Sequence, residues 1–72
     1  MKQYLVIGLG NFGASIVKSL MKEGHEVFAV DKKEEKVDKF KSKATYTAQA
    51  DASDRDALEA LGVSSFDVAI IT

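Results

Sequence analysis

The chain contains no cysteine, so disulfide bonds and thiolate-ligated metal sites are excluded. Its formal net charge is only −1, which argues against a nucleic-acid-binding protein that relies on a broad basic surface. No apolar stretch approaches the roughly 20 residues that a membrane-spanning helix needs. The first residues have a strand pattern rather than that of a signal peptide, so the cytoplasm is the expected compartment. What remains is the composition of one small soluble domain, or of part of one.

Three glycines mark a predicted turn between a strand and a helix. Gly8, Gly10 and Gly13 form a G-x-G-x-x-G pattern directly after an apolar run at 3–7, which is typical of a strand buried on both faces. The first glycine permits a tight turn, the second lets the backbone approach a pyrophosphate, and the third lets helix and strand pack closely. The free N–H groups of the helix then face the phosphates. A purely structural turn is the alternative, but the surrounding pattern favours nucleotide binding.

An acid closes the second predicted strand, 26–30. Asp31 lies about twenty residues after the glycine turn, where its carboxylate would accept hydrogen bonds from both ribose hydroxyls of a nucleotide. A carboxylate there also repels a 2′-phosphate, which favours NAD or adenosine nucleotides over NADP. Lys32 weakens that exclusion slightly because a cation beside the acid can meet a phosphate. The alternative is that Asp31 is only a polar strand end or a helix cap.

The apolar pattern predicts strands and helices in strict alternation. Strands are predicted at 3–7, 26–30, 45–49 and 66–71, and helices at 11–23, 33–43 and 53–61. The first helix carries an apolar stripe at helical spacing, formed by Phe12, Ile16, Val17 and Leu20. This order predicts an α/β fold, a Rossmann-like doubly wound parallel sheet with strand order 3-2-1-4. The binding crevice would open between strands one and four, beside the glycine turn and Thr72.

The predicted sheet lacks part of a full Rossmann domain. Such a domain has two further strands beyond the fourth, which here would be an open apolar edge. Residues 1–72 are therefore expected to be the N-terminal part of a longer nucleotide-binding domain, or a fragment that needs a partner.

A short polar segment follows the third predicted strand. Ser53 is predicted to cap the third helix, with Asp56 three residues later completing a box-like cap. Asp51 lies at the edge where an adenine ring would bind, and its carboxylate can accept a hydrogen bond from the adenine amino group. The helix cap and the adenine contact are compatible with each other.

The remaining polar residues indicate no catalysis. The charged run from Asp31 to Lys43 is expected to be the solvated face of an amphipathic helix, and His25 a surface or helix-capping residue. No Ser-His-Asp triad, carboxylate pair or metal-ligand cluster accompanies the glycine turn. The chain is therefore expected to hold a nucleotide without transforming it, with no catalytic residue and no metal.

Taken together, these motifs resemble the RCK N-terminal domain, also called KTN or TrkA-N, of Trk- and Ktr-type potassium transport regulators. The resemblance rests on segments 6–13, 25–31, 51–53 and 58–63, and it covers the whole chain. It implies a nucleotide sensor that binds NAD(H) or an adenine nucleotide such as ATP, ADP or AMP. It also implies a homo-oligomer, a dimer or a ring, that docks on a membrane potassium transporter or channel subunit. Such a regulator would be cytoplasmic and peripheral to the inner face of the membrane, and a C-terminal ligand domain would follow residues 1–72.

One position departs from the family pattern. Ktr-type members often carry arginine directly after the second glycine, where it can meet the terminal phosphates of a triphosphate. Asn11 is uncharged and shorter, so NAD(H), ADP or AMP is at least as plausible a ligand as ATP. The resemblance supports Asp51 and Ala52 as adenine-end contacts. The complete predicted cofactor site comprises Gly8, Gly10, Asn11, Phe12, Gly13, Asp31, Lys32, Asp51, Ala52 and Thr72.

Two other functions stay open at this point. The chain can instead be the cofactor-binding half of an NAD-dependent dehydrogenase, whose substrate half would carry a positioned histidine or lysine. It can also be a structural dimerisation module with a vestigial crevice, in which case no adenine nucleotide would bind.

Overall fold

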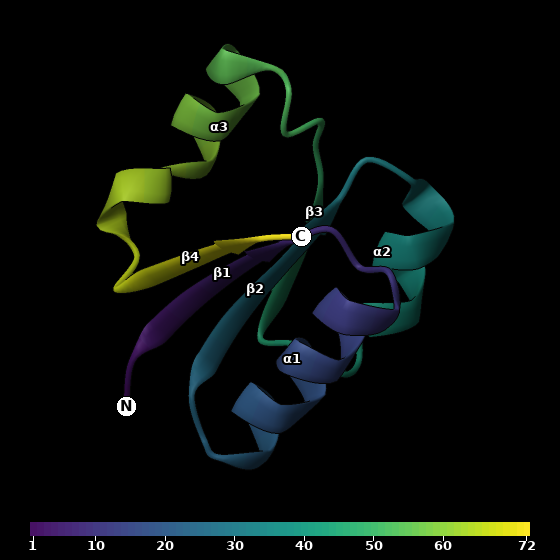
Figure 1. Ribbon diagram of the computed structural model, residues 1–72, viewed down its shortest axis with the longest axis vertical. Helices are drawn as coiled ribbons and strands as arrows, with labels where there is room; N and C mark the ends of the chain where they lie inside the picture. The colour runs from purple at the N-terminus through teal and green to yellow at the C-terminus, as the bar shows by residue number, and fades with distance from the viewer.

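The computed structural model describes residues 1–72 as a parallel sheet with helices on both faces (Figure 1). The strands are β1 (Gln3–Ile7), β2 (Glu26–Asp31), β3 (Tyr46–Gln49) and β4 (Val68–Ile71). The helices are α1 (Asn11–Lys22), α2 (Glu34–Phe40) and α3 (Arg55–Leu61), with a 3-10 turn at Val63–Ser65. The strands run in the order β3-β2-β1-β4, and all three strand pairs are parallel. The predicted Rossmann-like α/β fold and its strand order are confirmed.

The central strand β1 separates two apolar clusters because its side chains alternate between the faces of the sheet. Val6 belongs to a cluster with Val17 of α1 and Phe40 of α2. Leu5 and Ile7 belong to the cluster on the opposite face, which α3 covers. Figure 1 shows this division, with α1 and α2 on one side of the strands and α3 on the other. The predicted burial of β1 on both faces is confirmed, since Leu5 and Val6 are both fully buried.

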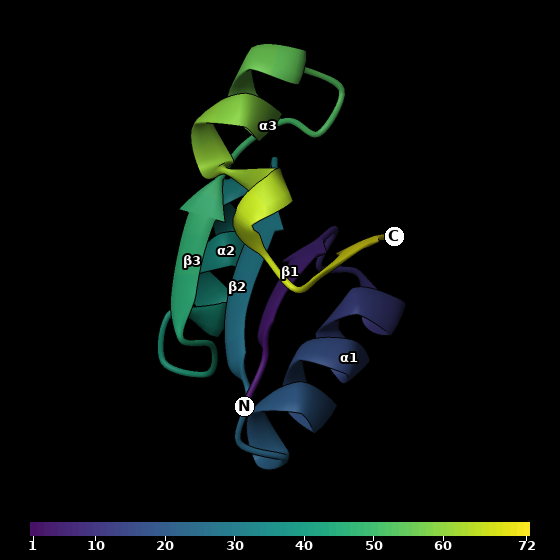
Figure 2. The same ribbon diagram turned by 90° about the vertical axis from the view of Figure 1, so that its left-hand side faces the viewer.

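The strands place the predicted site residues at one edge. The parallel register aligns Ile7 of β1 with Val30 of β2 on one side and with Ile71 of β4 on the other. The residues that follow these positions therefore emerge together at the carboxyl edge of the sheet. Figure 2 shows α3 at the top, above the ends of β2 and β3, and the C-terminus on the right, beyond β1.

Phe12 does not join the buried stripe that the helical spacing predicts, and its side chain is 68% exposed. The buried residues of α1 are Gly13 and Val17, which lie one turn apart. Gly13 sits against the backbone of the turn after β1, and this contact sets the rotation of α1 about its own axis. Residue 12 precedes Gly13 by about 100° of helical rotation, so its side chain points away from the sheet.

The cap of α3 is Asp54 and not the predicted Ser53. The Asp54 carboxylate accepts hydrogen bonds from the backbone N–H groups of Asp56, at 3.0 Å, and of Ala57, at 3.4 Å. Ser53 instead donates its hydroxyl and its backbone N–H to the carboxylate of Asp51. The Ser53 side chain is thus turned back toward the end of β3, and the next acceptor along the chain caps the helix.

Replacing Asp54 with alanine is expected to lower the free energy of unfolding by about 1 kcal/mol, because two N–H groups of the first turn lose their acceptor. Ser53→Ala removes a hydroxyl that caps nothing, and its expected cost is smaller. Urea unfolding of the two variants measures the difference. An equal or larger loss in Ser53→Ala would contradict the assignment of the cap.

The other boundaries lie within a few residues of the predicted ones. The helix predicted at 33–43 is helical only over α2, seven residues. The last strand begins at Val68 rather than at Phe66, whose ring instead packs edge-on against Phe28 with centroids 4.7 Å apart. The longest helix, α1, has 12 residues, and none of the helices has the length and apolar character needed to cross a membrane.

Candidate functional site

The turn after β1 requires glycine at two positions. Gly8 has a φ of +99°, which side-chain-bearing residues rarely adopt, and its N–H donates to the carbonyl of Val30 at 2.8 Å. A Cβ atom on Gly13 would overlap the carbonyl oxygen of Gly8. By contrast, a Cβ atom on Gly10 would meet nothing within 4 Å. The backbone is therefore tightly packed below the turn and open above it, where the first N–H groups of α1 lack intrahelical partners.

Thr72, which follows β4, packs against the glycine turn and forms hydrogen bonds with its backbone. Its N–H donates to the carbonyl of Ile7 at 2.9 Å, and its hydroxyl donates to the carbonyl of Gly8 at 2.9 Å. These bonds join the end of β4 to the end of β1 across 64 and 65 residues of sequence. The strand order predicts this neighbourhood, and the threonine hydroxyl adds a side-chain bond that the sequence pattern did not indicate.

Asp31 connects the end of β2 to the glycine turn. Its side chain is buried, with 9% exposed, and one carboxylate oxygen accepts from the N–H of Leu9 at 2.7 Å. The other oxygen accepts from the N–H of Lys33 at 2.9 Å. Burial by itself would raise the pKa of Asp31, but these two hydrogen bonds and the charges of Lys36 and Lys33 hold the pKa below its usual value. The carboxylate is therefore ionised at neutral pH, and it organises the turn as well as facing the crevice.

Asp51 forms a compact turn with Ser53 after β3. One carboxylate oxygen accepts from the Ser53 N–H at 2.9 Å and from the Ser53 hydroxyl at 2.7 Å. These hydrogen bonds, aided by the charge of Lys32, lower the pKa of Asp51 against a small opposing effect of desolvation. The side chain is exposed, and its second carboxylate oxygen accepts no hydrogen bond within the protein.

A cavity of about 240 Å³ lies where these residues meet, and we call it the carboxyl-edge crevice. It is lined by Gly8, Asp31, Lys32, Ala50, Asp51, Ala52 and Thr72. All of these except Ala50 belong to the predicted cofactor site. Ala50 enters because it directly follows β3 and donates its N–H to the carbonyl of Asp31 at 3.1 Å. Its position directly after a strand could have indicated that Ala50 lines the site. Sequence reasoning missed it because alanine carries no polar group that could bind a ligand.

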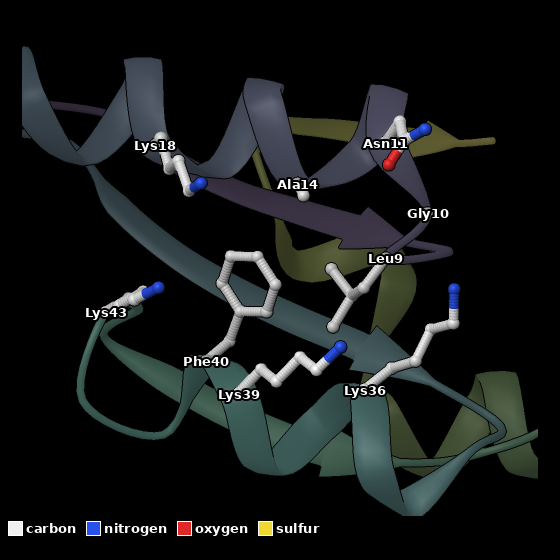
Figure 3. A pocket seen from close by; sticks show the side chains of 9 residues that line it. All are labelled: Leu9, Gly10, Asn11, Ala14, Lys18, Lys36, Lys39, Phe40 and Lys43. Atoms are coloured by element: carbon white, nitrogen blue, oxygen red, sulfur yellow. The ribbon is translucent and has the colours of Figure 1, made fainter.

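The other predicted site residues lie outside that crevice. Gly13 is buried beneath the turn, and Phe12 is exposed at the start of α1. Gly10 and Asn11 line a separate cavity of about 280 Å³ between α1 and α2, which we call the lysine groove (Figure 3). The two cavities have no lining residue in common, and they lie on either side of the glycine turn.

The arrangement has the form of a dinucleotide-binding edge, and sequence comparison decides the family. A family model described as the TrkA-N domain matches residues 4–72. The chain belongs to the TrkA-N family. The resemblance drawn from the glycine turn, Asp31 and the segment after β3 is therefore confirmed.

Named relatives of this TrkA-N chain occur in bacteria. It is 49% identical over 70 residues to the Ktr system potassium uptake protein A of Bacillus subtilis (strain 168), and 43% identical to the Ktr system potassium uptake protein C of the same organism. It is 31% identical to the Ktr system potassium uptake protein A of Vibrio alginolyticus. Each match covers 97% of this chain but 32% of the relative, so the chain spans about a third of these proteins' length.

A solved structure shares the fold of the TrkA-N chain. The UDP-glucose-4-epimerase of Stenotrophomonas maltophila, determined with bound NAD and formylated UDP-arabinopyranose, matches with a TM-score of 0.76 and 26% identity. The match covers 99% of this chain and 24% of the epimerase. The same sheet and helices thus occur in a protein that binds a dinucleotide.

Proposed function

We propose that this chain is a non-catalytic, nucleotide-binding module that regulates a potassium uptake system. The observation that carries the proposal is the carboxyl-edge crevice of about 240 Å³, which places the Asp31 carboxylate beside the glycine turn. The connection to potassium comes from the two Bacillus subtilis relatives, which are named as potassium uptake proteins. The chain spans 32% of the length of these relatives, so the role proposed for the whole protein is inferred from about a third of it.

In the proposed complex the phosphates lie over the turn at Gly8 and Gly10, facing the first N–H groups of α1. The Asp31 carboxylate accepts hydrogen bonds from the ribose hydroxyls. Each of its oxygens has more than one acceptor position, and the backbone N–H groups of Leu9 and Lys33 use one position on each. A carboxylate engaged in this way is both ionised and immobile, which favours a ribose without a 2′-phosphate.

The adenine end lies toward the loop after β3. The unpartnered oxygen of Asp51 is available to an adenine amino group, and Ala52 lines the crevice beside it. A second hollow of about 550 Å³, lined by Lys32, Lys33, Gln49, Ala50 and Asp51, adjoins the crevice through its shared residues. It adds room for the base beside the crevice.

We propose that the site has no strong preference for a triphosphate, because residue 11 is asparagine. We expect NAD(H), ADP or AMP to bind at least as tightly as ATP, because an uncharged side chain at this position adds no cation for a third phosphate. Isothermal titration of the intact protein with each nucleotide measures the ranking. Asn11→Arg is the matched variant and is expected to raise ATP affinity about tenfold, the gain of one charge-assisted contact. ATP binding far more tightly than ADP and NAD to the unaltered protein would overturn this expectation.

Regulation requires that nucleotides distinguish two arrangements of the protein. We infer that the module is part of a homo-oligomer, a dimer or a ring, and that exchange of nucleotides of different charge at the crevice shifts it between two arrangements. That shift would gate a membrane potassium transporter or channel subunit, with the module peripheral to the inner face of the membrane. Residues 1–72 would be the N-terminal part of a longer domain, which agrees with a β4 edge where Ile71 is 64% exposed.

The epimerase match favours one alternative, the cofactor-binding half of an NAD-dependent enzyme such as a dehydrogenase. The regions that flank this segment in the intact protein distinguish the two. A substrate domain with a positioned histidine or lysine would favour the enzyme, and a second ligand-binding domain would favour the regulator.

A further inference from the structure

Four lysines surround the lysine groove, and none of them forms an ion pair. Lys18 comes from α1, Lys36 and Lys39 come from α2, and Lys43 comes from the turn that follows α2. The other lining residues are Leu9, Gly10, Asn11, Ala14 and Phe40, so no carboxylate borders the groove. The single ion pair of the protein joins Lys41 to Asp38 and lies outside this lining. The positive charge of the groove is therefore not balanced by any residue of its own lining, although Lys36 also acts on the nearby Asp31 carboxylate.

The positions on α2 explain the concentration of charge. Apart from the adjacent pair 39 and 40, residues 36, 39, 40 and 43 lie three, four or seven positions apart, so they share the side of the segment that faces α1. The acidic residues of α2, Glu34, Glu35 and Asp38, are absent from the lining and occupy other sides. Figure 3 shows Lys18 on α1 opposite Lys39 and Lys43, with Phe40 between them and Leu9 nearer to Lys36.

The groove also has an apolar floor. Phe40 and Leu9 are 5% and 4% exposed, and the ammonium group of Lys43 lies 5.8 Å from the centroid of the Phe40 ring. An apolar floor strengthens the attraction of the lysines for an anion, because it lowers the local dielectric constant. It offers no exposed aromatic face on which a nucleobase could stack.

We propose that the lysine groove is a second anion-binding site that takes a compact phosphate-bearing ligand. It has no lining residue in common with the carboxyl-edge crevice, although Gly10 and Asn11 at its rim also border the proposed position of the nucleotide phosphates. Several cations around one cavity match a multivalent anion, and lysine binds phosphate as a point charge. The volume of about 280 Å³ is several times the roughly 30 Å³ of one water, enough for a pyrophosphate or a phosphorylated headgroup. This inference goes beyond the proposed function and requires no nucleotide in the crevice.

The experiment titrates inorganic pyrophosphate into the intact, nucleotide-free protein by calorimetry. The double variant Lys18→Gln with Lys39→Gln removes one groove lysine from each helix. Its matched control, Lys22→Gln with Lys41→Gln, removes the same charge from neighbouring positions outside the groove. We expect the groove variant to lose about tenfold or more in affinity and the control to lose little, since each removed charge contact contributes modestly to binding.

A second arm distinguishes the source of the phosphate. Co-sedimentation with phosphatidylcholine vesicles, with and without phosphatidylglycerol, tests a lipid headgroup in place of a free ion. Lysine-dependent binding in either arm supports the site and identifies its source. Equal affinity of the groove and control variants in both arms would overturn the proposal, as would absence of binding in both. A pyrophosphate that bound only in the carboxyl-edge crevice would give the first of these results.

Folding of the groove variant has its own readout. Four like charges around one cavity repel one another, so Lys18→Gln with Lys39→Gln is expected to melt no lower than the unaltered protein at low salt. Pyrophosphate should raise the melting temperature of the unaltered protein and not that of the groove variant.

Discussion

Replacing Gly13 with alanine is expected to lower the free energy of unfolding by about 3 kcal/mol and to abolish nucleotide binding. A Cβ atom at this position would overlap the carbonyl oxygen of Gly8, which is backbone and cannot rotate away as a side chain could. α1 would have to move off β1, and the turn above it would move with the helix. Urea unfolding measures the first effect, and calorimetric titration with NAD or ADP measures the second.

Gly10→Ala is the matched control for this prediction. It makes the same chemical change three residues earlier, where a Cβ atom would meet nothing within 4 Å and φ is −73°. Its stability is expected to stay within about 1 kcal/mol of the unaltered protein, because Gly10 is the N-cap of α1, where alanine is somewhat less favourable than glycine but meets no atom. A similar loss of stability in both variants would show that close packing at Gly13 is not what makes the third glycine necessary.

Asp31→Ala is expected to weaken nucleotide binding by about a hundredfold or more. The estimate takes two lost hydrogen bonds from ribose hydroxyls to a charged acceptor at about 1.5 kcal/mol each. The same substitution leaves the buried N–H of Leu9 without its acceptor at 2.7 Å, which should lower the free energy of unfolding by about 2 kcal/mol. Titration with NAD and ADP, combined with urea unfolding, separates the two effects.

Asp54→Ala is the control for the stability component, because it destabilises α3 from outside the carboxyl-edge crevice. It should retain the nucleotide affinity of the unaltered protein. Unchanged affinity in Asp31→Ala would remove the ribose assignment, whatever its effect on stability.

The pH dependence of stability gives an independent measure of the Asp31 interactions. Its folded-state pKa is lowered, so its contribution is fully present above the unfolded-state pKa and is lost as the pH falls through the folded-state value. For an aspartate this loss lies below about pH 4. Unfolding followed from neutral to acid pH should thus show a shallower decline in Asp31→Ala than in the unaltered protein.

The fold was predictable because its determinants are local or general. A continuous apolar run at β1, a glycine turn and a helical pattern define one strand-helix unit, and its repetition leaves few chain paths for a parallel sheet. The neighbourhood of Gly8, Asp31 and Thr72 follows from that order alone, because parallel strands bring their carboxyl ends to one edge. Most of the crevice lining was therefore predictable before any side chain was placed.

Details that depend on the rotation of an element or on competition between acceptors were not predictable. Phe12 fits an apolar stripe by spacing, yet contact between Gly13 and the Gly8 carbonyl turns it outward. Ser53 and Asp54 are both good caps, and the bond from Ser53 to Asp51 leaves Asp54 to cap α3. Neither outcome can be derived from propensity, since both depend on atoms brought together by the fold.

The sequence by itself determined the strand order, the glycine turn and the acid that faces it, because spacing along the chain controls all three. Only the tertiary structure decided what the charged run after Asp31 would do. That run was predicted to be a solvated face, and as a linear pattern its charges alternate in sign. Packing of α2 beside α1 sorts Lys36, Lys39 and Lys43 toward Lys18 and leaves the acids elsewhere. Charge along a chain is averaged, whereas the charge that a ligand meets depends on which sides of two helices face each other.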